Sequence, residues 1–226
     1  MNRVIQKIIA GDKFRKSRLH DEQGKVVPIG EIGKLPLRAL QAILARRNIY
    51  SSAPWWPPAA VRRIDGLIDK SWTVIEFGSG MSTLWLADRA GRVISVEGNR
   101  DWYDRIASSF GDRKNVDYLF RAPSAYTDIP APSDRIDLVV VDGERRADCI
   151  NWAMARLPAG AWLYLDNSDA DKDHVASLPT RAFLARRKLL ELAAAGRVSI
   201  EVLRGFPPAN LVASEGFLAR ILGRSA

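Results

Sequence analysis

Acidic side chains stand at the ends of four apolar runs in this chain, and that placement gives them a chemical use. They are Glu76, Glu97, Asp142 and Asp166. Each run has the length and apolar composition of a buried strand, and its interior carries no acid. Ligands of open parallel sheets bind beyond the carboxyl ends of the strands. We therefore expect these carboxylates to lie near a bound ligand.

A glycine turn follows the first of these acids. Gly78, Ser79 and Gly80 lead into an amphipathic stretch at 82–90. Glycine allows backbone to pass close to a ligand in dihedrals that a Cβ would forbid. The next apolar run ends at Glu97, which is 19 positions after Gly78 and close to the spacing of about 20 that suits an acid bound to two ribose hydroxyls. This strand–turn–helix–strand order predicts a site for a nucleotide-like ligand.

The details of the turn narrow the choice of ligand. The dinucleotide fingerprint has a third glycine where Thr83 stands, and the chain has no G-x-x-x-x-G-K-[ST] phosphate loop. S-adenosylmethionine (SAM) has a ribose but no phosphate, so a looser turn suffices. Residues 76–80 (EFGSG) and 96–102 (VEGNRDW) resemble the first two motifs of the class I SAM-dependent methyltransferases. The resemblance implies that these residues bind SAM: Glu76, Gly78, Ser79, Gly80, Ser82, Thr83, Glu97 and Asp142.

A second pattern, VDGER at 141–145 and LYLDN at 163–167, resembles the catechol O-methyltransferase branch of that family. There, an Asp after the fourth strand and an Asp-Asn pair after the fifth hold Mg²⁺. Matched residue by residue, the ligands here would be Asp142, Asp166 and Asn167. Such a shell leaves room for substrate oxygens, and the cation would lower the pKa of an acceptor hydroxyl. Two alternatives stay open for these residues: hydrogen bonding of SAM or substrate without a metal, and structural capping.

The candidate catalytic residues are Asp142 and Arg145. That branch has a lysine base three positions after its first Asp, where this chain has Arg145. An arginine cannot deprotonate an acceptor, but it can orient an anionic group or stabilise an oxyanion. We also expect Arg145 to be the partner of the two aspartates if no metal is used. His174 is a minor candidate for a general base, because the loop after the fifth strand faces the site in this fold, whereas His20 is expected at the surface.

The elements that must position these residues alternate between strand and helix. Further strands are expected at 116–120, 137–141 and 161–165, and helices at 61–68, 102–110, 149–157 and 180–195. The last two strands, at 198–203 and 215–222, are joined by a short loop without a helix, which predicts an antiparallel hairpin at the sheet edge. The fold class is therefore α/β, a doubly wound, mostly parallel sheet of seven strands with a basic helical N-terminal extension.

Residues 1–54 differ from the rest and predict an extension or lid in front of a methyltransferase domain at 55–226. The extension is basic, and one helix face is indicated by its apolar spacing: Leu37, Leu40, Ile43 and Leu44. It ends in the rigid connector SSAPWWPP at 51–58. Trp55 and Trp56 are expected either to pack on the core or to cover an acceptor pocket.

Composition sets outer limits on function. The chain has 226 residues, a net charge of +8 and one cysteine, Cys149, so neither an intrachain disulfide nor a cysteine-based zinc cluster can form. Cys149 is expected to be a buried, inert thiol. No stretch approaches the ~20 apolar residues of a membrane span, and residues 1–13 lack the features of a signal peptide, so a cytoplasmic location is expected.

The resemblance implies methyl transfer from SAM to an oxygen of a small-molecule acceptor, driven mostly by proximity. Two other functions stay open. The basic surface suits an RNA methyltransferase, although the amino-methylation motif [ND]-P-P-Y and a Pro-Cys nucleophile are both absent. The third is a SAM-binding scaffold protein without catalysis. The oligomeric state is not predicted.

Overall fold

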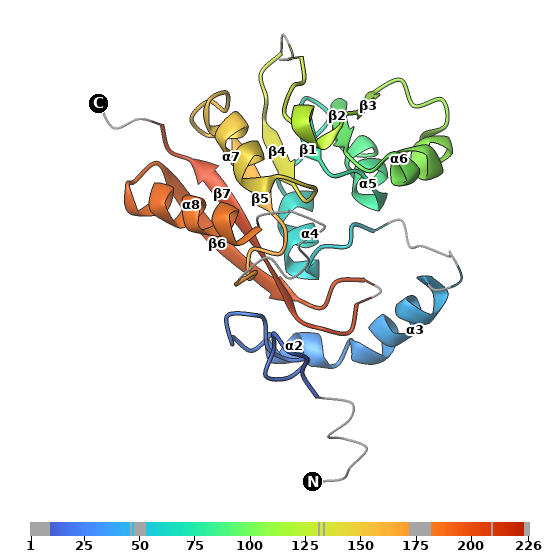
Figure 1. Cartoon of the computed structure of the whole chain (residues 1–226), viewed down its shortest axis with the longest axis vertical. Helices are drawn as coiled ribbons and strands as arrows, with labels where there is room; N and C mark the ends of the chain where they lie inside the picture. The colour runs from blue at the N-terminus through green and yellow to red at the C-terminus, as the bar shows by residue number, and fades with distance from the viewer. Residues whose placement is uncertain are drawn as a thin grey trace.

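The computed structural model describes residues 10–45, 47, 53–130, 132, 134–171, 182–208 and 210–223. Its strands form one sheet with helices on both faces (Figure 1). The strands are β1 (Thr73–Phe77), β2 (Arg92–Glu97), β3 (Val116–Phe120), β4 (Leu138–Val141), β5 (Trp162–Leu165), β6 (Val198–Gly205) and β7 (Ser214–Ile221). The helices are α2 (Ile29–Ile32), α3 (Leu35–Ala45), α4 (Pro58–Asp65), α5 (Met81–Ala87), α6 (Arg100–Ala107), α7 (Arg146–Met154) and α8 (Ala182–Ala194), with 3₁₀ turns η1 (Ser108–Phe110) and η2 (Pro123–Ala125).

The strand order is β3-β2-β1-β4-β5-β7-β6. β1 to β5 run parallel, whereas β7 is antiparallel to both β5 and β6. This confirms the predicted doubly wound, seven-stranded, mostly parallel sheet and its closing hairpin. The direction in which strands are added reverses between β1 and β4. Such a switch point opens a crevice at the carboxyl ends of the two strands, where ligands of these sheets bind.

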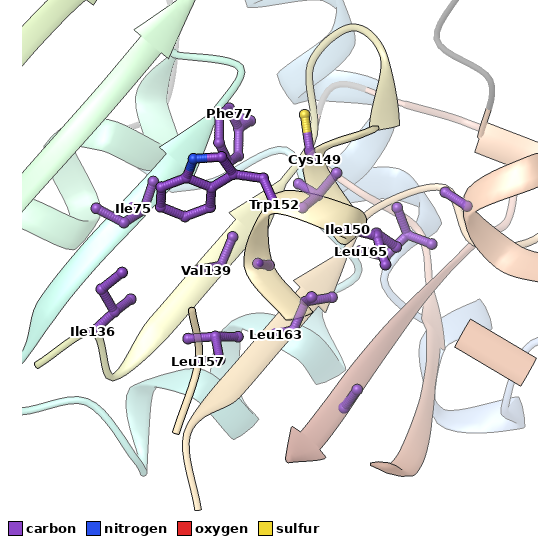
Figure 2. Close-up of a cluster of buried hydrophobic side chains, with 14 of the residues drawn as sticks. Ile75, Phe77, Ile136, Val139, Cys149, Ile150, Trp152, Leu157, Leu163 and Leu165 are labelled. Atoms are coloured by element: carbon purple, nitrogen blue, oxygen red, sulfur yellow. The ribbon is translucent and has the colours of Figure 1, made fainter. Parts of the chain in front are cut away.

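Each face of the sheet has its own apolar core, because alternate strand residues point to opposite faces. On one face Ile75 and Phe77 of β1 pack with Trp152 of α7 (Figure 2), and the rings of Phe77 and Trp152 meet edge to face with centroids 5.4 Å apart. On the other face Val74 packs with Leu86 of α5. All of β4 is buried, as expected for a central parallel strand covered on both sides.

Several helix bounds differ from the prediction for local reasons. α4 begins at Pro58 instead of residue 61, because proline is favoured in the first turn of a helix. α7 begins at Arg146 instead of residue 149, after Arg145, whose φ of 47° is left-handed. α6 begins at Arg100, two residues early, where the Asn99 side chain caps the helix. In the parts of the chain that the structure describes, no helix is long and apolar enough to cross a membrane.

The N-terminal segment at 10–45 packs against the turn that joins β6 and β7. Val27 contacts Phe206 and Ala213 there. Among residues 10–45, which the structure describes, the predicted helical character is found in α2 and α3, whereas 10–28 contains two isolated β-bridges. The exposed face of α3 carries three of the predicted apolar side chains, each about half exposed: Leu37, Leu40 and Ile43. The division of the chain into an extension at 1–54 and a domain at 55–226 stays a prediction.

Candidate functional site

A cavity of about 390 Å³ opens at the carboxyl ends of β1, β2 and β4, where the strand order reverses. It is lined by Trp55, Gly78, Ser79, Gly80, Met81, Ser82, Glu97, Asn99, Trp102, Asp142 and Gly143. Six predicted site residues are therefore brought together on one wall: Gly78, Ser79, Gly80, Ser82, Glu97 and Asp142. The other predicted site residues are not among those that line it: Glu76, Thr83, Arg145, Asp166 and Asn167.

The glycine turn after β1 is shaped by its contact with the turn after β4. Gly78 has φ +101°, and a Cβ on it would lie 2.4 Å from the backbone nitrogen of Gly143. A Cβ on Gly143 would lie 2.0 Å from the hydroxyl oxygen of Tyr126. A Cβ on Gly143 would also lie 2.8 Å from the backbone of Gly78. The turn after β1 and the turn after β4 therefore approach so closely that each requires a glycine at the contact. Sequence reasoning assigned the glycines to close approach by a ligand and missed Gly143, which the Asp-Gly pair after β4 could have indicated.

Glu97, at the end of β2, has its carboxylate in the cavity wall, bonded to the surrounding backbone. Oε2 accepts a hydrogen bond from the Ser79 amide at 3.1 Å, and Oε1 accepts from the amides of Gly98 at 2.9 Å and Asn99 at 2.7 Å. Burial raises the pKa of Glu97, and these amides oppose that shift. Each carboxylate oxygen has about two acceptor sites. Glu97 therefore ties the glycine turn to β2, lines the cavity, and keeps one further acceptor site, on Oε2.

Glu76 is fully buried, does not line the cavity, and connects β1 to α5 through hydrogen bonds. Its carboxylate accepts hydrogen bonds from three buried hydroxyls: Ser82 at 2.5 Å, Thr83 at 2.5 Å and Ser95 at 2.6 Å. Burial raises the pKa of Glu76 to about 7, against the effect of these donors. Thr83 also accepts from the Gly80 amide at 3.0 Å, so the residue at the position of the third fingerprint glycine ties the turn to Glu76.

The Asp142 carboxylate lines the cavity and is oriented by two buried side chains. Oδ2 accepts a hydrogen bond from Nε1 of Trp56 at 3.0 Å, and Oδ1 accepts from Nη2 of Arg146 at 3.2 Å. Burial raises the pKa of Asp142, and the positive charge of Arg146 opposes that shift. With its side chain 25% exposed, Asp142 presents an oriented hydrogen-bond acceptor to the cavity.

The two tryptophans of the connector have different environments. Trp56 is fully buried between Trp85 and Tyr164, with ring centroids 6.1 Å and 4.8 Å away. Trp55 is 41% exposed and lines the cavity. Trp56 therefore packs in the core and Trp55 lines the cavity, so each of the two predicted alternatives holds for one of the tryptophans.

Asp166 and Asn167 follow β5 and are engaged in internal hydrogen bonds. Oδ1 of Asp166 accepts from the Tyr164 hydroxyl at 2.8 Å, and Nδ2 of Asn167 donates to the Ser214 hydroxyl at 3.1 Å. Burial and the neighbouring charge of Asp142 raise the pKa of Asp166 well above its usual range. The fourth and fifth strands are neighbours, as predicted, so the three residues do lie at adjacent strand ends.

The arginine that meets these residues is Arg146, not Arg145. Nε of Arg145 donates to Asp148 at 2.7 Å and its Nη1 donates to the carbonyl oxygen of Pro123 at 2.8 Å, which places that guanidinium on the loop after β3. The prediction that Arg145 is the partner of the aspartates is wrong in this structure. The backbone of Arg145 is left-handed, and its side chain is directed away from the aspartates, whereas the side chain of the next residue, Arg146, is directed toward Asp142.

The residues predicted to bind Mg²⁺ do not fit a metal in this arrangement. Oδ1 of Asp142 and Oδ1 of Asn167 both accept hydrogen bonds from the same guanidinium, that of Arg146. The side chains of Asp142 and Asn167 and the backbone carbonyl of Asp166 therefore surround a side-chain cation.

Other sequence expectations concern the cysteine and the histidines. Cys149 is buried in the core drawn in Figure 2, as predicted, and burial raises the pKa of its thiol well above the usual range. His20 is bonded to the Ser17 hydroxyl at 2.7 Å in the N-terminal segment. His174 lies outside the described residues. Sequence reasoning also missed Trp102, whose Nε1 donates to the carbonyl of Ser79 at 2.8 Å from the cavity wall.

Neither a protein-family model nor a curated protein sequence matches this chain. Solved structures match its fold. An O-methyltransferase from Bacillus cereus, in complex with S-adenosylhomocysteine (SAH), matches with a TM-score of 0.56 and 19% identity over 86% of this chain and 93% of that one. TomG, an O-methyltransferase from Streptomyces achromogenes involved in tomaymycin synthesis and solved with SAM, has a TM-score of 0.52 and 21% identity over 83% and 80%. An rRNA methylase from Streptococcus thermophilus has a TM-score of 0.51 and 12% identity over 73% and 97%. The chain therefore has the fold of the class I SAM-dependent methyltransferases.

Proposed function

We propose that this protein is an enzyme that transfers the methyl group of SAM to an oxygen of a small-molecule acceptor. The observation that carries the proposal is the joint placement of Glu97 and the glycine turn 78–80 on the wall of one cavity. An acid at the end of the second strand beside such a turn is suited to bind ribose hydroxyls. The volume of about 390 Å³ is in the range of about 300–1,000 Å³ that is usual for small-ligand sites.

The lining residues have separate tasks in this proposal. Bound SAM supplies an electrophilic methyl group. Glu97 accepts hydrogen bonds from the ribose, Gly80 and Ser82 flank the methionine part, and Asp142 faces the reacting side. Holding the methyl donor and the acceptor together is worth up to about 7–11 kcal/mol of the barrier. Asp142 can hydrogen-bond an acceptor hydroxyl and orient its oxygen.

RNA methylation is the second candidate, because the net charge of +8 favours a polyanion and one matching fold is that of an rRNA methylase. A transfer assay separates the candidates. The purified protein is incubated with methyl-labelled SAM and either a small-molecule extract or total RNA, and Glu97→Ala is run beside the surface control Glu191→Ala. We expect label in the small-molecule fraction, lost in Glu97→Ala and kept in the control.

Label found only in RNA would overturn the small-molecule part of the proposal. SAM binding with no transfer to either pool would favour the non-catalytic scaffold. Where label does enter small molecules, its stability toward mild alkali separates esters from ethers, and release as methylamine on hydrolysis would contradict transfer to oxygen.

A further inference from the structure

Two of the side chains that the sequence suggested as metal ligands, those of Asp142 and Asn167, contact one arginine, which also bonds to the backbone carbonyl of the third residue, Asp166. Arg146 is the first residue of α7, and its side chain is 7% exposed. A helix N-terminus disfavours positive charge, because the helix dipole is positive there. The guanidinium extends from this position to the ends of β4 and β5, where Asp142, Asp166 and Asn167 lie. The unfavourable interaction of the guanidinium with the dipole of α7 is offset by its attraction to the carboxylates of Asp142 and Asp166.

All three nitrogens of this guanidinium are engaged. Nε donates to the Gly143 carbonyl at 2.9 Å, Nη1 to the Asp166 carbonyl at 2.5 Å, and Nη2 to the Asp142 carbonyl at 2.7 Å. Nη2 also donates to Oδ1 of Asp142 at 3.2 Å, and Nη1 to Oδ1 of Asn167 at 3.3 Å. The backbone carbonyls hold the guanidinium in one orientation, and its two remaining contacts go to side-chain oxygens of the suggested metal ligands.

Two other carboxylate oxygens of the pair have donors outside the guanidinium. Oδ2 of Asp142 accepts from Trp56, and Oδ1 of Asp166 accepts from Tyr164. The negative charge of the partly exposed Asp142 raises the pKa of the buried Asp166, and such a pair of carboxylates needs a compensating cation or proton. A single guanidinium with five N–H donors in a planar fork is suited to bind several oxygens at once.

We propose that Arg146 is the resident cation of this site, in the place that a metal ion would take in the catechol O-methyltransferase branch, and that it positions the Asp142 carboxylate toward the cavity. The proposal rests on the function proposed above and deepens it, because the methyl transfer then uses an oriented carboxylate in place of a metal-bound acceptor. Arg146 is not among the residues that line the cavity, and it acts through Asp142, which is. It is a positioning residue.

The first consequence concerns metal binding, and Mn²⁺ is the probe. Removing a fixed positive charge beside these oxygens would strengthen the binding of a second cation by roughly 1,000-fold for each unit of charge that the cation carries, the factor for two unit charges about 4 Å apart at an effective dielectric constant of about 20. We therefore expect Arg146→Ala to gain a Mn²⁺ site that wild type lacks. Arg145→Ala is the matched comparison, since it removes the same charge from the adjacent residue.

The experiment titrates Mn²⁺ into the full chain and follows the electron paramagnetic resonance signal of the free ion. Wild type, Arg146→Ala, Arg145→Ala, Asp142→Asn and the double variant Arg146→Ala/Asp142→Asn are compared, with folding checked by circular dichroism. We expect binding in Arg146→Ala alone, and its loss in the double variant. Arg146→Lys keeps a cation in the site and is expected to bind no Mn²⁺.

Binding of Mn²⁺ by wild type that Asp142→Asn abolishes would overturn the proposal, and so would a folded Arg146→Ala that gains no site. If Arg146→Ala does not fold, the wild-type and Arg146→Lys titrations decide by the same criterion. SAH binding is measured on the same wild-type sample by calorimetry. Its failure would count against the proposed function and leave the metal result in place, so the two claims fail separately.

Discussion

The buried carboxyl group of Glu76 should make the stability of the fold depend on pH in a defined direction. Its folded-state pKa is about 7, against an ordinary value of 4.5. The folded protein therefore binds a proton more tightly than the unfolded chain does. The contribution of this group to stability is highest at acid pH, falls as pH rises from about 4.5 to about 7, and is then constant.

The size of the effect follows from that shift. With one pKa unit equal to about 1.4 kcal/mol, the free energy of unfolding should fall by about 2 to 3 kcal/mol through Glu76 between about pH 5 and about pH 8. Urea unfolding of wild type and Glu76→Gln across this range isolates the term, because the other titrating groups cancel in the difference. The stability of wild type relative to the variant should decline with rising pH by that amount.

Hydrogen-bond donors around Glu76 act against the effect of burial on its pKa. Ser82, Thr83 and Ser95 all donate to the Glu76 carboxylate, and such donors favour its ionised form. A difference between wild type and variant that is flat with pH would mean that these donors outweigh burial and that Glu76 is ionised throughout. Glu191→Gln, on the exposed face of α8, is the matched control and should show no pH-dependent difference from wild type.

Three further substitutions test the packing around the site by denaturant unfolding. Gly143→Ala would place a Cβ 2.0 Å from the Tyr126 hydroxyl and should destabilise by about 1–3 kcal/mol, and a neutral result would contradict the close turn contact. Trp56→Phe removes the indole donor to the cavity aspartate and should destabilise by about 1.5–3 kcal/mol, whereas a change below about 0.5 kcal/mol would show that the bond is not made. Arg186→Met leaves the fully buried Glu215, which it contacts at 2.7 Å, with one fewer cation and should destabilise by about 3–5 kcal/mol; unchanged stability would rule out that buried pair.

The sheet could be predicted from the sequence because its signals are local. A few consecutive residues are enough to predict the strands β1, β2 and β4 from their apolar runs, and the turn 78–80 from its glycines. The same holds for the hairpin of β6 and β7, whose connecting loop is too short for a crossover helix. The six predicted residues that line the cavity follow from this topology, since parallel strands place their carboxyl ends at one edge.

The roles of adjacent residues could not be separated in this way. Arg145 and Arg146 are neighbours of one type, and only the left-handed backbone at Arg145 decides which guanidinium turns toward the aspartates. Trp55 and Trp56 pose the same problem. They are adjacent residues of one type, and the sequence does not show which side chain packs in the core and which lines the cavity. Glu76 looked equivalent to the other strand-end acids, but it lies within β1, one residue before its end, and its side chain is directed under the turn.

Calorimetric titration of SAH into the folded protein shows directly whether this cavity binds the cofactor. We expect micromolar-range binding by wild type, about −8 kcal/mol. Glu97→Ala should weaken it by about 1.5–3 kcal/mol, the value of hydrogen bonds to a charged group, and Glu191→Ala should leave it unchanged. Absence of SAH binding to folded wild type, or equal affinity in folded Glu97→Ala, would contradict the assignment of this cavity to SAM.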